Sequence, residues 1–423
     1  MTGTRAGQLT HQPALPNLKV PSASGPKGSP KRPREETAGL ADVFPYYAGF
    51  SFEWARDQLS VIAPNDDDVV LDPWNGSGTT TLAATSNGHR SVGIDLNPIA
   101  NLVASLRGGV HAVTEASDPP PKPSGSFSTA TDPLLSWLSP QTVLRVRQWT
   151  NHLQSQAKPV SALGYVSLFR VVRRLTERFE GSNPTWVKRA ASPDQLVHVE
   201  SDQLDVLLVA DQRYILNRLR SSDELGGIQA TLITASANRL PLANRSVDVV
   251  LTSPPYLTRI DYAVAYAREL AVVGVDIAKD RSLRSSLMGT TLIRPGQTAN
   301  VPSYRTLATS LVNDVSKHKS KASAGYYLKQ VRQYLDDLSS SFDEITRVTK
   351  DEATLTLVVQ DSYYKDIHIR LAEICIEEAE ARGWKLYAAS PKEVTRLLTA
   401  VNTAARKYPK GKVNETVVTL KKG

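Results

Sequence analysis

Residues 252–256 read Thr-Ser-Pro-Pro-Tyr and carry groups that can hold a planar base bearing an amino group. They follow the apolar run 247–251, which predicts a strand ending at this point. Prolines cannot continue a strand, so nearby carbonyl groups stay rigid and unpaired. The Ser253 oxygen and the Pro254 carbonyl can accept the amine hydrogens, which makes the nitrogen nucleophilic, while Tyr256 stacks on the ring. A simple turn after a strand is the other interpretation.

A second stretch, 69–84, has the pattern of a nucleoside-binding unit. A β-rich run ends at Asp72, a Gly-x-Gly turn follows, and a helix-compatible segment comes next. Glycines allow close approach of a ligand, and a helix N-terminus favours a negative group. The next predicted strand, 91–95, ends in Asp95, which is placed to accept from ribose hydroxyls. Thr81 replaces the third glycine of the dinucleotide fingerprint, which argues against NAD, and Asp72 suits an ammonium group.

Together these segments resemble the DNA amino-methyltransferases, which use S-adenosylmethionine to methylate cytosine N4 or adenine N6. Residues 72–80 are similar to the glycine motif of that family, with Trp74 in place of the usual phenylalanine. Residues 253–256 match its catalytic tetrapeptide. Residues 44–51 resemble the segment that precedes the glycine motif in the family, and 414–420 resemble its closing strand.

The resemblance implies the residues of the site and S-adenosyl-L-methionine as the cofactor. The catalytic residues implied are Ser253, Pro254, Pro255 and Tyr256. The cofactor-binding residues implied are Tyr47, Phe50, Asp72, Pro73, Trp74, Gly76, Gly78, Thr79, Asp95 and Ser236. Ser236 follows the third predicted strand, where family members often carry an acidic or amide residue.

The order of the strands and helices that must position these residues indicates an α/β fold. We expect a Rossmann-like doubly wound sheet of seven strands with largely helical insertions. Helical segments separate the early strands, which indicates a mostly parallel sheet. The strands are predicted near 68–71, 91–95, 230–234, 247–251, 354–360, 384–388 and 415–421. The glycine motif precedes the tetrapeptide, whereas many Ser-Pro-Pro-Tyr enzymes have the reverse order.

Composition predicts how the 423 residues divide into segments. Residues 1–40, rich in Pro, Ser, Gly and basic residues, are predicted to be a disordered tail. The methyltransferase domain is predicted as a cofactor-binding half over 41–112, a catalytic segment over 227–262 and a C-terminal part over 336–423. Two insertions are predicted, a helical one over 113–226, the candidate DNA-recognition region, and a mixed one over 263–335.

Positive charge is concentrated in residues 141–190, which hold nine Lys and Arg against two Glu, whereas the whole chain has a net charge of +8. Interleaved aromatic residues make this segment typical of a surface that meets phosphates. A solvated amphipathic helix with its aromatic residues in the core is the other interpretation. The predicted nucleic-acid contacts are Arg170, Arg173, Arg174, Lys188, Arg189 and Arg259.

Cysteine and histidine usage excludes several kinds of chemistry. One cysteine excludes internal disulfides and fits a reducing cytoplasm, and the seven scattered histidines predict no metal site. Methylation at cytosine C5 needs a thiolate. Cys375 lies in a helical-looking segment whose acidic neighbours raise a thiol pKa, so this reaction is disfavoured. The sequence shows no long apolar run and no signal-peptide pattern, so neither membrane insertion nor secretion is predicted. This favours a cytoplasmic protein.

The predicted function is therefore site-specific DNA methylation at an exocyclic amino group. Cytosine N4 is favoured because Ser253 heads the tetrapeptide. Adenine N6 is the first alternative, an RNA guanine-N2 type methyltransferase the second, and an inactive nucleic-acid-binding methyltransferase fold the third. The target base must leave the duplex stack to reach the site. DNA is the expected partner, together with a cognate restriction or defence nuclease.

Overall fold

The computed structural model describes most of the chain, and the account below is confined to those parts. The described residues are 30–31, 43–44, 46, 49–109, 113–122, 131–181, 187–220, 229–257, 260–295, 304–320, 323–394 and 412–423. The tail predicted over 1–40 lies outside them except for residues 30–31.

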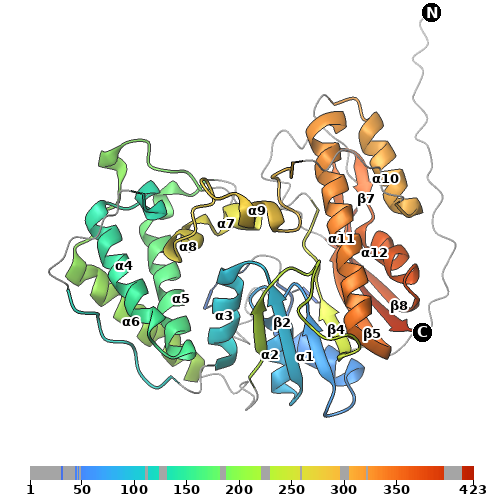
Figure 1. The fold of residues 1–423 in the computed structure, drawn as a ribbon, viewed down its shortest axis with the longest axis horizontal. Coiled ribbons are helices and arrows are strands. Elements are labelled where there is room, and N and C mark those ends of the chain that lie inside the picture. The colour runs from blue at the N-terminus through green and yellow to red at the C-terminus, as the bar shows by residue number, and fades with distance from the viewer. Residues whose placement is uncertain are drawn as a thin grey trace, which may run out of the picture.

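A seven-stranded sheet with the order β3-β2-β1-β4-β5-β9-β8 forms the centre of the molecule (Figure 1). The strands from β3 to β5 pair in parallel, and β9 is antiparallel to both of its neighbours. Their bounds are β1 Val69–Asp72, β2 Arg90–Asp95, β3 Thr231–Thr234, β4 Val247–Thr252, β5 Thr349–Gln360, β8 Trp384–Glu393 and β9 Asn414–Lys422. The predicted doubly wound α/β sheet is confirmed, with each predicted strand in place.

Helices cover both faces of this sheet because its central strands are apolar on both sides. Val70 of β1 belongs to the core beneath α1 (Phe52–Ile62) and α2 (Thr79–Ser86). The next residue, Leu71, points to the opposite face and belongs to the core that contains α11 (Leu328–Val348). Successive strand residues alternate between faces, so an uninterrupted apolar run builds both cores.

A helical lobe lies beside α3 (Pro98–Gly109), at the opposite end of the molecule from β8 (Figure 1). Its helices pack around a core that includes the fully buried Trp149, Phe169 and Leu208. The lobe comprises η3 Pro133–Ser136, α4 Pro140–Gln154, α5 Lys158–Leu175, η4 Glu177–Phe179, η5 Pro193–Gln195 and α6 Ser201–Arg220. This segment is mainly helical, as its sequence periodicity indicates.

Short helices connect this lobe to the far side of the sheet, and α11 and α12 then pack against the sheet. The elements are α7 Tyr262–Ala265, α8 Ala267–Val272, α9 Ser282–Ser286, α10 Thr306–Lys317, the π-helix η6 Ser323–Tyr327, α11 and α12 Leu371–Glu380. A small hairpin of β6 (Ser362–Tyr364) and β7 (Ile367–Ile369) precedes α12. Across the described ranges, no helix is long and apolar enough to cross a membrane.

Candidate active site

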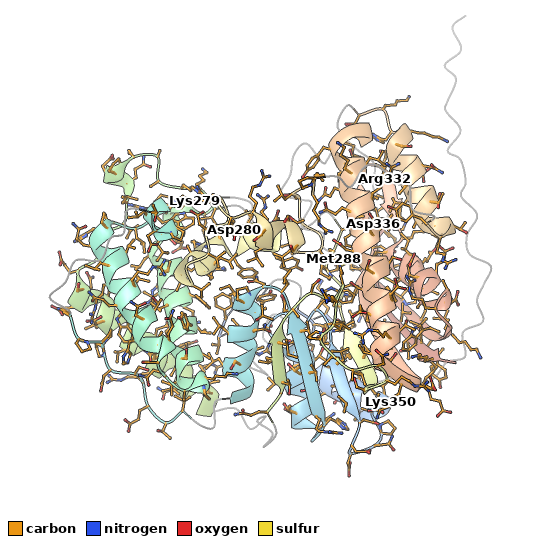
Figure 2. All side chains as sticks on the ribbon, in the orientation of Figure 1. Lys279, Asp280, Met288, Arg332, Asp336 and Lys350 are labelled. Carbon is orange, nitrogen blue, oxygen red and sulfur yellow. The ribbon has the colours of Figure 1, made fainter. Side chains whose placement is uncertain are left out.

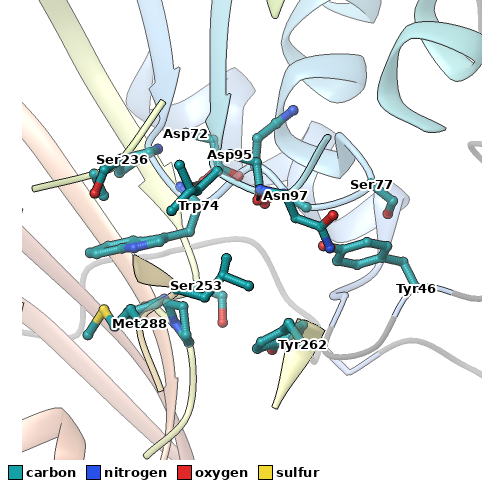
Figure 3. A pocket seen from close by; sticks show the side chains of 18 of the residues that line it. Tyr46, Asp72, Trp74, Ser77, Asp95, Asn97, Ser236, Ser253, Tyr262 and Met288 are labelled. Carbon is teal, nitrogen blue, oxygen red and sulfur yellow. Dashed lines mark hydrogen bonds between the residues drawn. The ribbon is translucent and has the colours of Figure 1, made fainter. Parts of the chain in front are cut away.

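A pocket opens at the carboxyl ends of β1, β2, β3 and β4 (Figure 3). This is the edge at which open α/β sheets bind their ligands. The pocket is lined by many of the residues predicted from the sequence: Phe50, Asp72, Pro73, Trp74, Gly76, Thr79, Asp95, Ser236, Ser253, Pro254 and Pro255. Segments far apart in the chain therefore meet in one space.

Asp72 is the buried acid at the end of β1, and it is 3% exposed. The Thr252 hydroxyl donates to its Oδ1 at 2.6 Å, and the backbone N–H of Trp74 donates to the same oxygen at 3.1 Å. Burial raises the pKa of Asp72 to about 6. No ion pair with Asp72 occurs in the described part of the chain, so this carboxylate is suited to a cationic ligand.

Asp95 ends β2 and holds the glycine turn in place. Its Oδ2 accepts from the N–H of Gly76 at 2.9 Å, and its Oδ1 accepts from the N–H of Asn97 at 2.8 Å. Burial raises the pKa of Asp95 to about 6 as well. Each carboxylate oxygen keeps acceptor capacity beyond these bonds, so Asp95 can still accept from hydroxyl groups of a ligand.

The two glycines of the turn have different roles. Gly76 lines the pocket with φ +50°, and a Cβ there would lie 3.1 Å from the ring of Tyr46. Gly78 has φ +81° and does not line the pocket. A Cβ on Gly78 would lie 2.7 Å from that of Ala104, so this glycine allows α2 to pack against α3.

Tyrosines form one side of the pocket. Tyr46 stacks on Tyr266, with ring centroids 4.8 Å apart, and lies 6.4 Å from Tyr262. Tyr46 and Tyr262 line the pocket, whereas the predicted contact Tyr47 lies outside the described residues. Burial raises the pKa of Tyr46 well above its ordinary value, and Asp95 adds to the shift, so the hydroxyl stays protonated. The aromatic character of this segment was visible in the sequence, but its orientation was not.

Several pocket residues were not predicted: Tyr46, Asn75, Ser77, Leu96, Asn97, Asn238, Tyr262, Leu287 and Met288. Asn97 has a recognisable signal, because it precedes Pro98 and its Oδ1 accepts from the N–H of Ile99 at the start of α3. That signal indicates a helix cap and gives no indication of a pocket. Met288 lies in the segment predicted as the second insertion and belongs to the same core cluster as residues of α11 (Figure 2 labels Met288).

The turn at residues 253–256, here called the tetrapeptide turn, brings three of its four residues to the pocket. Ser253, Pro254 and Pro255 line it, and Ser253 faces the space shared by Trp74 and Tyr262 (Figure 3). Tyr256 is half-buried and does not line the pocket. The predicted contact Arg259 lies outside the described residues, and Asp261, close to it in sequence, pairs with Arg284 at 2.9 Å.

The segment directly after β3 contains Ser236 and, two residues later, the amide side chain of Asn238. Ser236 lines the pocket, and its Oγ accepts from the N–H of Asn238 at 3.2 Å. The Asn238 side chain donates to Asp337 at 3.0 Å and accepts from Ser341 at 2.7 Å, both on α11. Asn238 therefore fixes the β3 end to α11, and Ser236 is the polar side chain left facing the pocket.

The five predicted nucleic-acid contacts that the structure describes divide into two groups, and none of these five lines the pocket. Arg170 pairs with Asp211 at 2.9 Å, and Arg173 pairs with the fully buried Glu269 at 2.7 Å. Their charges are matched inside the protein. Arg174, Lys188 and Arg189 are exposed, although Arg174 also lies 4.0 Å from Asp211.

Cys375 is fully buried in α12, as predicted for a core helix residue. Burial raises the pKa of its thiol far above the ordinary value, and Glu378 and Asp361 add to the effect. A thiolate at this position is therefore disfavoured. Within the described residues, no group of three or more His, Cys, Asp or Glu side chains is placed to hold a metal ion.

Comparison with known proteins gives matches to DNA methyltransferases. Residues 35–103 match a family described as DNA methylase. Type II methyltransferase M.BsoBI of Geobacillus stearothermophilus is 26% identical over 297 residues, which are 61% of this chain and 57% of that protein. Type II methyltransferase M.AvaI of a Nostoc species is 22% identical over 386 residues, 81% of this chain and 78% of that protein.

A solved structure of a methyltransferase from Methanosarcina mazei aligns over 85% of this chain and 93% of its own, with 11% identity and a TM-score of 0.31. The fold is established by the strand order and pairing described above. The DNA methylase match covers the glycine motif, and the two type II relatives extend the similarity beyond it. These matches show that the chain is similar to DNA amino-methyltransferases, a family whose cofactor is S-adenosyl-L-methionine.

Proposed function

We propose that this protein transfers a methyl group from S-adenosylmethionine to an exocyclic amino group of DNA, with cytosine N4 as the favoured target. The observation that carries the proposal is Asp72, a buried carboxylate with a raised pKa and no ion pair among the described residues, beside a glycine turn. Such a group fits the ammonium of the methionine part of the cofactor. Asp95 fits the ribose hydroxyls, and Gly76 leaves the space that a Cβ would fill.

The bound cofactor supplies an electrophilic methyl group, and the chain must position the amine that receives it. Ser253 and the Pro254 carbonyl are acceptors at the same pocket, and Tyr46 and Tyr262 offer aromatic surfaces there. Acceptors directed at the amine hydrogens make the nitrogen lone pair available. Direct transfer to nitrogen needs no enzyme nucleophile, which agrees with the buried, high-pKa thiol of Cys375.

Product analysis tests this function. The protein is incubated with methyl-labelled S-adenosylmethionine and duplex DNA, and the nucleosides released by digestion are identified by mass spectrometry. We expect N4-methylcytosine, whereas N6-methyladenine would support the first alternative. A parallel incubation with RNA tests the guanine-N2 alternative. Recovery of 5-methylcytosine would overturn the mechanism, and cofactor binding without any methylated product would support the inactive fold.

DNA binding is proposed for the helical insertion over 113–226, with the exposed residues Arg174, Lys188 and Arg189 as contacts. The logarithm of the DNA-binding constant falls linearly with the logarithm of salt concentration, by about 0.9 for each phosphate contact. Replacing Lys188 and Arg189 with Gln should therefore make this slope shallower by about 1.8. Replacing Arg170 and Arg173 should instead lower the melting temperature, since the buried Glu269 would lose its partner and the buried Asp211 would keep only Arg174, at 4.0 Å. An unchanged slope in the first variant would remove these two residues from the interface.

The similarity to type II methyltransferases suggests a further partner. This partner would be a restriction or defence nuclease whose cleavage is blocked by the same methylation. The match to two type II methyltransferases supports this proposal. Cytoplasmic location stays a prediction. Protection of a DNA fragment from a nuclease encoded beside this chain, after methylation in vitro, would test the partnership.

A further inference from the structure

One face of α11 carries a stripe of buried polar side chains. Each member lies three or four residues from another member, so together they lie along one side of the helix. None is more than 3% exposed, and the polar stripe consists of Gln330, Gln333, Tyr334, Asp337 and Ser341. Buried polar groups are destabilising unless they are hydrogen-bonded, so their partners reveal what the stripe holds.

Two glutamines of the stripe bind the backbone of residues 284–294, here called the pocket wall. Gln330 donates to the carbonyl of Thr290 at 3.4 Å, and Gln333 donates to that of Leu292 at 3.1 Å. Gln333 also accepts from the N–H of Arg294 at 2.9 Å. The pocket wall contains Leu287 and Met288, which line the pocket, so α11 fixes part of its surface.

Asp337 extends the same stripe in two directions. It pairs with Arg294 at the end of the pocket wall and accepts from Asn238 at the end of β3. Ser341, one turn further along, donates to the same Asn238. One helix face therefore holds the pocket wall and the β3 end together.

Tyr334 is the member of the stripe that reaches the tetrapeptide turn. Its hydroxyl donates to the carbonyl of Pro255 at 2.7 Å. Tyr334 is 1% exposed, and burial raises its pKa well above the ordinary value, so the hydroxyl keeps its proton and acts as a donor. Pro255 has no N–H with which to anchor itself, which leaves its carbonyl as the group that the protein can hold.

The pocket wall also touches the turn directly. Gly289 has φ +78°, and a Cβ there would lie 3.0 Å from the carbonyl oxygen of Tyr256. The wall thus packs closely against the last residue of the turn, while Tyr334 holds the residue before it. Both contacts restrict the same short backbone.

We propose that Tyr334 is a positioning residue, whose hydroxyl fixes the Pro255 carbonyl and thereby orients the Ser253 and Pro254 acceptors toward the target amine. This inference rests on the proposed function. It assigns to α11 a role in the methyl-transfer step, beyond its role in the core. A misplacement of about 1 Å in a catalytic constellation can lower a rate by about 100-fold, so loss of one hydrogen bond at this point should be visible in turnover.

The test compares Tyr334→Phe with Tyr304→Phe. Tyr304 also donates to α11, to Asp336 at 2.8 Å, but among the described residues its hydroxyl has no hydrogen bond to the tetrapeptide turn (Figure 2 marks Asp336). For Tyr334→Phe we expect kcat to fall about 10-fold to 100-fold. The Kd for S-adenosylmethionine should stay within about twofold, because Asp72 and Asp95 are untouched, and Tyr304→Phe should keep both values. If the polar stripe has only a structural role, Tyr334→Phe should have a lower melting temperature but an unchanged kcat at temperatures where the variant is folded.

An NMR measurement can detect the hydrogen bond between Tyr334 and Pro255 independently of enzyme activity. The sequence contains two Pro–Tyr pairs, Pro45–Tyr46 and Pro255–Tyr256. Labelling proline carbonyls with ¹³C and tyrosine amides with ¹⁵N therefore gives two cross-peaks, and Tyr334→Phe should shift the one from Pro255. An unmoved cross-peak would refute the hydrogen bond, and a shifted one with unchanged kcat would refute the positioning role. Cofactor binding by the wild-type protein without methylation of any nucleic acid would instead refute the proposed function.

Discussion

The two halves of the pocket are built in different ways. In the cofactor half, Asp95 holds Gly76 and Asn97, which lie on the β1–β2 connection and directly after β2. In the catalytic half, the turn after β4 is held by Tyr334, 79 residues further along the chain. The glycine turn of the first half is thus held by residues near it in sequence, although Asp72 also accepts from Thr252 of β4. The second half depends on a helix from a remote segment.

This difference has a physical consequence. A short motif carries its own geometry, because glycine, aspartate and a helix N-terminus act through nearby backbone groups. A turn of two prolines offers few backbone donors and must be positioned by contacts from elsewhere. The cofactor half should therefore be sensitive to changes within its motif, and the catalytic half to changes in α11 and the pocket wall.

The largest effect is expected from Asp72→Asn in the cofactor half. Loss of the charge should weaken S-adenosylmethionine binding roughly 100-fold, as for a charged hydrogen bond in a buried site. The same change should stabilise the protein without cofactor at pH 8 by about 1–3 kcal/mol, because a buried carboxylate with a raised pKa opposes folding there. Calorimetry and urea unfolding measure the two effects. Asp68→Asn is the matched control, a buried aspartate just before β1 and outside the pocket, and unchanged binding in Asp72→Asn would contradict the assignment.

Acidification should weaken cofactor binding next most strongly. Burial raises the pKa values of Asp72 and Asp95 to about 6, so both carboxyls become protonated as the pH falls below that value. The Kd should be constant above about pH 7 and rise about tenfold per pH unit below pH 6 for each carboxylate that binding requires. Acidification should have the opposite effect on the stability of the protein without cofactor. A buried carboxyl with a raised pKa stabilises the folded state at low pH, and this stabilisation is lost as the pH rises through 6. A Kd independent of pH between 5 and 8 would show that neither charge takes part.

Gly289→Ala tests the catalytic half with a smaller change. The added Cβ would press on the Tyr256 carbonyl at 3.0 Å, so we expect kcat to fall about 3-fold to 10-fold, less than a full 1 Å misplacement would cause. Gly274→Ala is the control, because Gly274 has a similar φ of +86° but open space around it. Both variants should lose about 1–2 kcal/mol of stability from the left-handed backbone. Equal kcat values for the two would show that contact with the turn is unimportant.

The smallest effect on turnover is expected for Cys375→Ser. The thiol is fully buried, and methylation of nitrogen needs no thiolate. Activity should remain within about twofold, while burial of a hydroxyl in an apolar core should lower stability by about 1–3 kcal/mol. Steady-state rates measured at 20 °C separate the two consequences. Loss of turnover in a folded variant would point to chemistry at the thiol and overturn the direct-transfer mechanism.

The sheet was predictable because each central strand is a short apolar run that ends in a distinctive residue. The run before Asp72 predicts β1, and the run 247–251 predicts β4, and both occur. The β6–β7 hairpin was not predicted, because strands of three residues are too short to show a period. The periodic segment around Cys375 indicated a core helix, which α12 confirms.

Side-chain partners were far less predictable than elements. A basic run in sequence does not distinguish Arg173, paired with the buried Glu269, from Arg189, which is exposed. The partners lie on different helices, and only packing brings them together. Similarly, the sequence indicated an aromatic segment before α1 and predicted Phe50 as a pocket residue, which it is, but it did not indicate Tyr46, which also lines the pocket and stacks on Tyr266.

The sequence by itself determined the strand–glycine–helix unit, the buried acids Asp72 and Asp95, and a tetrapeptide at the end of a strand, because these depend on local backbone preferences and on apolar runs. The tertiary structure decided which residues of the tetrapeptide turn face the pocket, which arginines keep their charge for solvent, and which helix holds the turn. Those outcomes depend on contacts between residues tens of positions apart, such as Tyr334 with Pro255 and Asp337 with Asn238. No local pattern encodes such contacts, since they form only when the sheet has brought its helices together.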